Sequence, residues 1–202
     1  MNLNIVSSFD IRYSNLISVS PLILVFLVIG VVGFWLAGVY NLLIRSRNRV
    51  KEAWSDIDVQ LKRRYDLIPN LIETVKGYAE HEKSTLDAVI QARSKAMGAQ
   101  TVKEHAEAEN MLTGALKSIF ALSENYPQLR AVESFTKLQD ELSDTENKIQ
   151  ASRRFYNTNV MTYNTQIESF PTNFIAGPFG FIKSDFFELT DTAQREPVQV
   201  KF

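Results

Sequence analysis

The sequence predicts an all-α protein with a single transmembrane helix near the N-terminus. An elongated antiparallel bundle of three to four long helices follows it, and then a phenylalanine-rich C-terminal tail. Only 8 Gly and 6 Pro occur among 202 residues, which is typical of long helices. An uncharged apolar run precedes a region in which apolar residues alternate at spacings of three and four. We divide the chain into an N-terminal flank, the transmembrane helix, the bundle and the tail, at residues 1–20, 21–43, 44–170 and 171–202.

The apolar run is long enough to cross a bilayer. No charged residue lies between Tyr13 and Ile44, and roughly 20 apolar residues in a helix span a hydrocarbon core of about 30 Å. A buried core helix would keep a polar face, which this run lacks. A cleavable signal peptide would have a shorter apolar run after a basic leader. We therefore expect a retained single-pass anchor in contact with membrane lipid.

Aromatic and basic residues mark one membrane boundary of this anchor. They are Trp35, Tyr40, Arg45, Arg47 and Arg49. Basic residues are much more frequent after the apolar run than before it. The positive-inside rule therefore places the C-terminal domain in the cytoplasm.

The first bundle helix is predicted from a seam of apolar residues. The seam consists of Trp54, Ile57, Leu61, Arg64, Ile68, Leu71, Val75 and Tyr78. No Gly or Pro lies between residues 40 and 67, so we expect the anchor to continue into this helix as one rod. Pro69 lies inside the pattern and predicts a kink near residues 64–68.

Three further helices complete the predicted bundle. A capping box at residues 84–87 is expected to open the second helix, which ends near Gly98. The third covers about residues 102–124, and the longest runs from Leu129 to just before Pro171. Two arrangements stay open. Either four separate helices pack together, or the first two join through Lys83 into one rod of about 80 Å and leave a three-helix bundle.

The tail differs from the bundle because it is rich in phenylalanine, glycine and proline. Solvated linkers are poor in aromatic residues, so these rings are expected to pack on the bundle, on another subunit or into the membrane interface. The candidate interaction surface is Phe174, Phe179, Phe181, Phe186 and Phe187. The alternating pattern of residues 196–202 is typical of a strand that could add to a partner.

Composition and motifs give little support for catalysis. The chain contains no cysteine, which excludes disulfides, thiolate metal sites and thiol nucleophiles. His81 and His105 both fall in charged, helix-surface contexts, and no nucleotide-binding, zinc-protease or serine-hydrolase motif occurs. The 22 Lys and Arg balance 23 Asp and Glu, so no basic field favours nucleic acid. We therefore expect no enzymatic activity, catalytic residues, metal, cofactor or nucleic-acid partner.

Arg64 is the most unusual polar residue because it falls on the apolar seam, where its charge needs a partner. The candidate partners on the last helix are Asp140, Asp144 and Glu146. Arg63 and Asp66 lie one turn apart and could pair with each other. A role in fixing the register of the bundle is favoured over a ligand site.

Several long motifs resemble the signature of LemA proteins. They include AWSDIDVQLKRRYDLIPNL at residues 53–71, VKGYA at 75–79, YPQL at 126–129, LQDEL at 138–142, RRFYN at 153–157 and FPTN at 170–173. The signature positions, which we interpret as structural, are Trp54, Arg63, Arg64, Asp66, Pro69, Asn70, Tyr78, His81, Glu82, Tyr126, Pro127, Tyr156 and Asn157.

The resemblance implies a helical bundle anchored in the inner membrane of a bacterium, with no catalytic residues to transfer. Relatives are linked to magnetosome membranes and to membrane metalloproteases. Some are exported lipoproteins with a cysteine just before the Tyr-Asn pair, which is Tyr40-Asn41 here. This chain has no such cysteine, so a helix span replaces the lipid anchor. The exported relatives leave open the alternative that the bundle lies on the outer side.

Two functional hypotheses follow. The first is a non-enzymatic bundle that assembles with copies of itself as a membrane scaffold or organiser. The alternative is an adaptor that presents substrates or partners to a membrane protease or a transport system. The aromatic tail would serve as the contact surface in either case.

Overall fold

The computed structural model describes residues 20–188, and this part of the chain is entirely helical apart from its turns and an extended C-terminal segment. The helices are α2 (Pro21–Lys76), α3 (Lys83–Gly98), α4 (Val102–Ser123), α5 (Pro127–Arg130), α6 (Glu133–Glu168) and α7 (Asn173–Ala176). No strand occurs among these residues. The predicted all-α class is confirmed. The N-terminal flank and the expected strand at residues 196–202, with Phe202, lie outside the described residues.

Helix α2 is continuous over 56 residues, or about 84 Å at 1.5 Å per residue. It is the one described helix that is long and apolar enough to cross a membrane. Residues 21–38 are all exposed, and burial begins at Leu43. The predicted single rod is therefore confirmed, with Pro69 inside the helix rather than at its end. We name residues 21–42 the apolar segment of α2.

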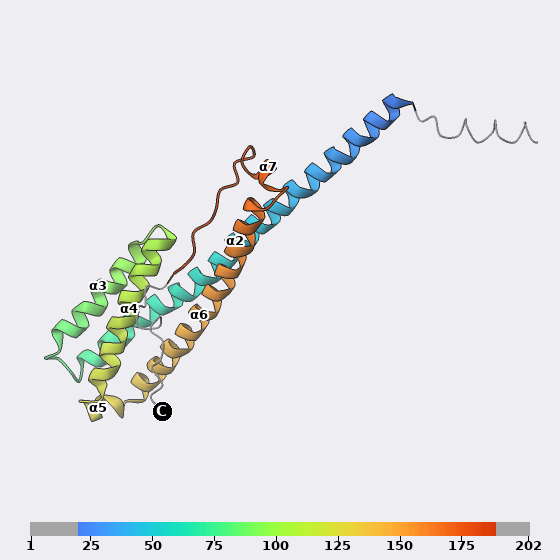
Figure 1. Ribbon diagram of the computed structural model, residues 1–202. Coiled ribbons are helices and arrows are strands. Elements are labelled where there is room, and N and C mark those ends of the chain that lie inside the picture. The colour runs from blue at the N-terminus through green and yellow to red at the C-terminus, as the bar shows by residue number, and fades with distance from the viewer. Residues whose placement is uncertain (1–19, 189–202) are drawn as a thin grey trace, which may run out of the picture.

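The remaining helices surround the other part of α2 (Figure 1). The antiparallel helix α6 packs along α2, and the α3–α4 hairpin covers the end that lies farthest from the apolar segment. The buried side chains include Ile57, Leu61, Ile68, Leu71, Leu112, Ile119 and Ile149. A turn separates α2 from α3. This break excludes the three-helix arrangement and confirms the arrangement with four long helices.

Two predicted helix starts were wrong. Helix α3 begins at Lys83, and its N-cap residue Glu82 makes no side-chain cap. The capping box is instead at α4, where Thr101 Oγ1 accepts from the Glu104 amide at 3.2 Å. Glu104 Oε2 in return accepts from the amide of Thr101 at 3.2 Å. Helix α6 begins at Glu133 rather than Leu129, because Pro127 starts the separate short helix α5.

The chain returns toward the bundle after α6 and α7. Residues 183–188, which we call the strap, run back along α6 in extended form (Figure 1). Phe181 and Phe187 are buried at the two ends of this return, with Phe187 0% exposed. This corrects the expectation that both rings belong to an interaction surface, because they complete the core of their own chain. Phe174, Phe179 and Phe186 remain exposed.

Candidate functional site

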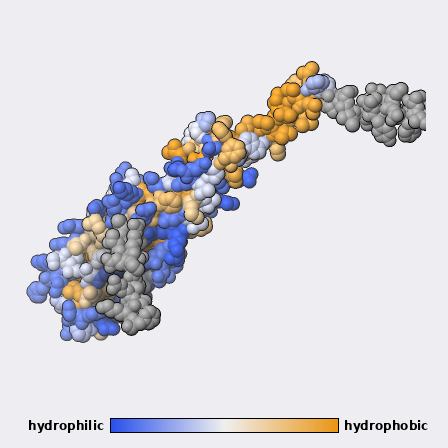
Figure 2. Space-filling model, in the orientation of Figure 1, coloured by the Kyte–Doolittle hydropathy of each residue, from blue (hydrophilic) through white to orange (hydrophobic). Residues whose placement is uncertain are grey.

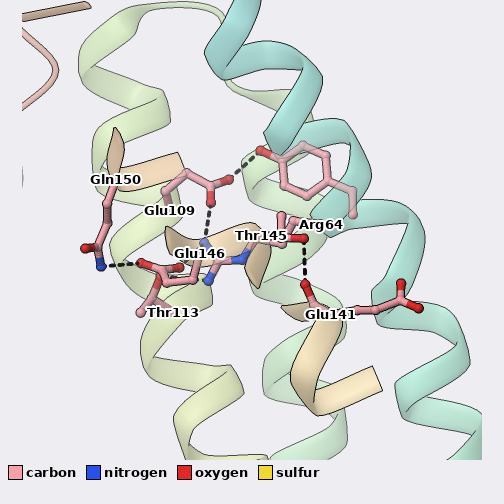
Figure 3. Close-up of polar contacts among 8 residues, drawn as sticks. Arg64, Glu109, Thr113, Glu141, Thr145, Glu146 and Gln150 are labelled. Atoms are coloured by element: carbon pink, nitrogen blue, oxygen red, sulfur yellow. Dashed lines mark hydrogen bonds and ion pairs between the residues drawn. The ribbon is translucent and has the colours of Figure 1, made fainter. Parts of the chain in front are cut away.

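Arg64 lies at the centre of the bundle, where α2, α4 and α6 meet, and is 3% exposed. Its Nη1 donates to Glu109 Oε2 of α4 at 3.1 Å, and its Nη2 donates to Thr113 Oγ1 at 2.7 Å. The same Nη1 lies 3.0 Å from Glu146 Oε2 of α6, in an ion pair without hydrogen-bond geometry. Figure 3 shows the guanidinium enclosed by these groups. One side chain thus connects three helices, and the predicted partner Glu146 is confirmed.

A second layer of hydrogen bonds holds the two carboxylates in place. The Tyr65 hydroxyl donates to Glu109 Oε1. Gln150 Nε2 donates to Glu146 Oε1 at 3.2 Å (Figure 3). Arg93 of α3 donates through Nε to the Tyr65 carbonyl oxygen at 2.8 Å. All four long helices are therefore tied to this cluster.

Burial governs the electrostatics of the cluster. It raises the pKa of Glu109, and the Arg64 charge and the Tyr65 hydrogen bond oppose this rise only in part. Burial and the Glu109 charge raise the pKa of Tyr65. Burial also lowers the pKa of Arg153, while Glu146 and Glu109 act against that change. The opposite charges of Arg64, Glu109 and Glu146 therefore partly offset one another inside the bundle.

Glu109 was not predicted as a partner, although the sequence carries the signal. Glu109, Leu112, Leu116, Ile119 and Ser123 alternate at spacings of three and four and are all buried. The rule that singled out Arg64 on its seam therefore also singles out Glu109 on the seam of α4. Two buried charges of opposite sign on facing seams predict a pair.

Arg63 and Asp66, which could have paired with each other, have other partners. Asp66 pairs with Lys62 at 3.0 Å across one helical turn, and both side chains are exposed. Arg63 faces α6 instead, where its Nη1 lies 3.5 Å from Asp144 Oδ2. The i,i+4 spacing of Lys62 and Asp66 explains this preference.

A cavity of about 240 Å³ opens onto Arg64 from the surface between α4 and α6. Its lining includes Lys117, Gln139 and Asn147 at the rim. The Arg64 guanidinium at its base is already bonded to Glu109 and Thr113. The cavity therefore leads to a cation whose charge is already paired with Glu109 and Glu146.

Trp54 organises a second cluster, which is aromatic. Its ring centroid lies 5.4 Å from that of His105, 5.5 Å from that of Tyr156 and 6.0 Å from that of Phe187. His105 is half-buried, and burial lowers its pKa against the opposing charges of Asp58 and Glu104. This corrects the expectation of a solvated His105, because its ring packs edge-on against Trp54.

The strap is held on α6 by side-chain amides. Asn157 Nδ2 donates to the Phe187 carbonyl oxygen at 3.1 Å, and Asn157 Oδ1 accepts from the Phe187 amide at 2.9 Å. Asn164 makes the same two bonds with Ser184, both at 2.9 Å. The Tyr156 hydroxyl donates to the Asp185 carbonyl oxygen at 2.9 Å, and burial raises the Tyr156 pKa to about 12. We name these contacts the asparagine clasp.

The predicted boundary residues lie where the bundle meets the apolar segment of α2. The Tyr40 ring centroid is 5.3 Å from that of Phe179 and 5.7 Å from that of Phe181. The Arg47 guanidinium carbon lies 5.3 Å from the centroid of the Phe181 ring. The other boundary residues, Trp35, Arg45 and Arg49, are exposed.

The remaining signature residues lie near the other end of the bundle. Pro69, Asn70, Tyr78 and His81 are exposed. The Tyr126 hydroxyl donates to Glu82 Oε1 at 3.2 Å, which links the turn before α3 to the start of α5 at Pro127. Within residues 20–188, no group of three His, Asp or Glu side chains is placed to hold a metal ion.

An open groove of about 720 Å³ lies between the strap and α4. Most of its lining residues are polar or charged, with both signs of charge, and they include one exposed aromatic ring. The lining residues are Lys103, Ala106, Glu107, Asn164, Lys183, Ser184, Asp185, Phe186 and Glu188. The groove is therefore a surface feature separate from the Arg64 cluster.

These features define a class of protein. It is a four-helix bundle in which one of the helices, α2, extends beyond the bundle and is long and apolar enough to cross a membrane. The model of the LemA family matches residues 53–202, and the chain belongs to this family. It is similar to "Protein LemA" of Metamycoplasma hominis, with 32% identity over 135 residues. The aligned region covers 65% of this chain and 60% of that relative.

Proposed function

We propose that this protein is a non-enzymatic, membrane-anchored helical bundle that assembles with copies of itself as a membrane scaffold. The continuity of α2 carries the proposal. One uninterrupted helix contains both the exposed apolar segment and the buried seam of the bundle. A helix without a break transmits position and orientation from the anchor to the bundle, as a scaffold requires.

The exposure of the apolar segment supports a lipid or protein environment for it. Large apolar side chains such as Phe26, Ile29 and Phe34 are 68%, 60% and 85% exposed. Soluble proteins rarely leave so large a contiguous apolar surface uncovered. A bilayer covers it without any further protein, and the basic residues beyond the segment support a bundle on the cytoplasmic side of the inner membrane.

Self-association is supported by small residues on the apolar segment. An added Cβ at Gly30, Gly33 or Gly38 meets no heavy atom within 4 Å, so nothing in the described chain packs there. Gly33 and Ala37 are four residues apart, which places them on one face of the helix. Small residues at this spacing allow two membrane helices to approach closely.

A non-enzymatic role agrees with the state of the polar groups. The buried carboxylates Glu109 and Glu146 both contact Arg64. Arginine remains charged in proteins and does not transfer protons near neutral pH. The cluster is thus suited to holding helices together.

The mass of the full-length protein in mild detergent tests the proposal. Size-exclusion chromatography with light scattering is expected to give a discrete oligomer, and Gly33→Leu is expected to weaken it. Gly38→Leu, the same substitution about 140° around the axis of α2, is the matched control. A monomer at every concentration would contradict self-assembly, and an oligomer indifferent to Gly33→Leu would exclude the Gly33 face as its contact.

The side of the membrane is tested separately. A cysteine introduced at the exposed residue Ser118 can be labelled with an impermeant maleimide in intact bacterial cells and in lysed cells. Labelling only after lysis is expected for a cytoplasmic bundle. Labelling of intact cells would place the bundle on the outer side.

The groove beside the strap favours a second candidate, an adaptor that holds a segment of another protein. Its lining combines the exposed ring of Phe186 with lysines and carboxylates, which suits a peptide of mixed charge. Crosslinking from Lys103 in cells, in the presence of a membrane protease or transport system, tests this role. Recovery of only this protein would argue for the scaffold.

A further inference from the structure

Residues 170–182 form an uncharged and largely apolar projection, which we call the foot. It contains α7 and the turns on either side, and no Asp, Glu, Lys or Arg occurs within it. Its exposed side chains are large: Phe170, Phe174, Phe179 and Ile182 are 78%, 69%, 61% and 79% exposed. Elsewhere in the bundle, exposed apolar side chains are scattered along the helices rather than gathered in one segment.

The foot is packed against the rest of the bundle through buried side chains. Ile175, Ala176 and Phe181 are buried beneath it. The rings of Phe170 and Phe174 meet edge to face, with centroids 5.9 Å apart. The buried side chains hold the foot on α2 and α6, while the exposed rings face outward.

The position of the foot along α2 indicates what covers it. Phe179 packs on Tyr40, which lies three residues before the first buried residue, Leu43. The foot therefore lies beside the level at which the apolar segment ends. Figure 2 shows hydrophobic surface on the exposed part of α2 and again around α7, whereas the opposite end of the bundle is mostly hydrophilic.

Charges next to the foot match a lipid surface. Arg45 and Arg49 are exposed on α2 within one to three turns of Tyr40. Lys183 follows the foot directly and pairs with Glu168 at the end of α6. Aromatic rings flanked by basic side chains are typical of the membrane interface, where headgroups meet hydrocarbon.

We propose that the foot is a second membrane contact, in which Phe170, Phe174, Phe179 and Ile182 enter the lipid interface of the leaflet from which α2 emerges. The inference rests on the proposed membrane anchoring. It adds that the bundle touches the bilayer at two places, the anchor and the foot. Two contacts restrict rotation of the bundle about the axis of α2, which a single spanning helix leaves free in the bilayer.

Spin labels test this in full-length protein reconstituted into vesicles of phosphatidylcholine and phosphatidylglycerol. The chain contains no cysteine, so single substitutions give unique labels. Phe174→Cys reports on the foot and Val28→Cys on the apolar segment. Phe155→Cys is the matched control, an exposed phenylalanine of α6 nearly four turns before the end of that helix. The measured quantities are collision rates with oxygen, which concentrates in lipid, and with a water-soluble nickel chelate.

The label at position 174 is expected to show a severalfold higher ratio of oxygen to nickel collisions than the label at 155. If the labels at positions 174 and 155 give equal collision ratios while the label at 28 gives a lipid-like ratio, the foot does not contact the membrane and the anchor still does. This result would overturn the proposal. Water-like values at 28 would overturn the anchor itself. A label at 174 shielded from both reagents would mean that protein, such as a second copy, covers the foot, and this would also overturn the proposal.

Discussion

The side-chain amide of Asn157 pairs with the backbone of Phe187 through two reciprocal hydrogen bonds, of 2.9 and 3.1 Å. Asn164 repeats this arrangement with Ser184. The spacing fits, since seven residues of helix advance about 10.5 Å and three residues of extended chain advance about 10 Å. The two amides therefore bind the strap in one register and direct Phe187 onto Trp54.

Loss of the clasp should release the strap. Asn157→Ala removes two hydrogen bonds of about 1 kcal/mol each, so exchange of the Phe187 amide should accelerate by about 5- to 30-fold. Hydrogen exchange with mass spectrometry of full-length protein in detergent measures this. Asn159→Ala is the control, because the Asn159 amide bonds only the Phe155 carbonyl oxygen of its own helix. Equal acceleration in both variants would show that helix fraying, and not the clasp, governs the strap.

Replacement of Phe187 by alanine should destabilise the bundle much more than the same replacement of Phe186. Phe187 is 0% exposed and Phe186 is 40% exposed. Phe187→Ala should cost about 3–5 kcal/mol of unfolding free energy, because it opens a cavity beside Trp54. Phe186→Ala should cost less than about 1 kcal/mol, because the ring lies at the surface and its loss leaves no enclosed cavity. Chemical denaturation followed by circular dichroism measures both, and equal costs would contradict the assignment of Phe187 to the core.

Arg64 should be far more sensitive than the adjacent Arg63. Arg64→Met leaves Glu109 and Glu146 without their shared cation inside the bundle and should cost about 3–5 kcal/mol. Arg63→Met breaks an exposed ion pair and should cost about 0–1 kcal/mol. The same denaturation experiment compares them. A small effect of Arg64→Met would mean that the carboxylates become neutral at little cost.

Glu109 and Glu104 should give opposite pH dependences. The Glu109 pKa is raised by burial, so the folded state holds this proton more tightly than the unfolded state. Wild type should therefore lose stability relative to Glu109→Gln as pH rises from the ordinary glutamate pKa through the raised one. The capping bonds lower the Glu104 pKa, so its contribution is present above the ordinary pKa and is lost as pH falls.

Unfolding of wild type, Glu109→Gln and Glu104→Gln across the range from pH 3 to pH 8 tests these signs, in the region where carboxylates titrate. A wild-type protein that gains stability relative to Glu109→Gln with rising pH would mean that Arg64 outweighs burial at Glu109.

Features that depend on local periodicity could be predicted from the sequence. The seam from Ile57 to Val75 and the need of Arg64 for a partner follow from residue spacing alone. Glu109 lies on an equally regular seam of α4, so residue spacing also predicts that it is buried and needs a partner. The pattern Thr101-x-x-Glu104 is likewise a readable capping box, although residues 84–87 offered a competing one.

The clasp could not be predicted from the sequence. The two asparagine side chains bind backbone atoms of the strap, and backbone atoms depend little on the type of residue. Asn157 and Asn164 have the composition of a helix surface, and they bind backbone atoms that lie 30 and 20 residues away. Any residue except proline at positions 184 and 187 offers the same amide and carbonyl. The burial of His105 against Trp54 is similar, since it depends on how α4 rests on α2.

Because α2 is long, a small tilt of its apolar segment produces a large displacement at its far end. Residues 43–76 extend about 51 Å beyond the apolar segment, so a tilt of about 10° displaces the far end by about 9 Å. Membrane helices tilt to match their apolar length to the thickness of the bilayer. If α2 spans the membrane and copies associate as proposed, a change in bilayer thickness becomes a sideways movement of the α3–α4 hairpin, and the tips of neighbouring copies separate or converge.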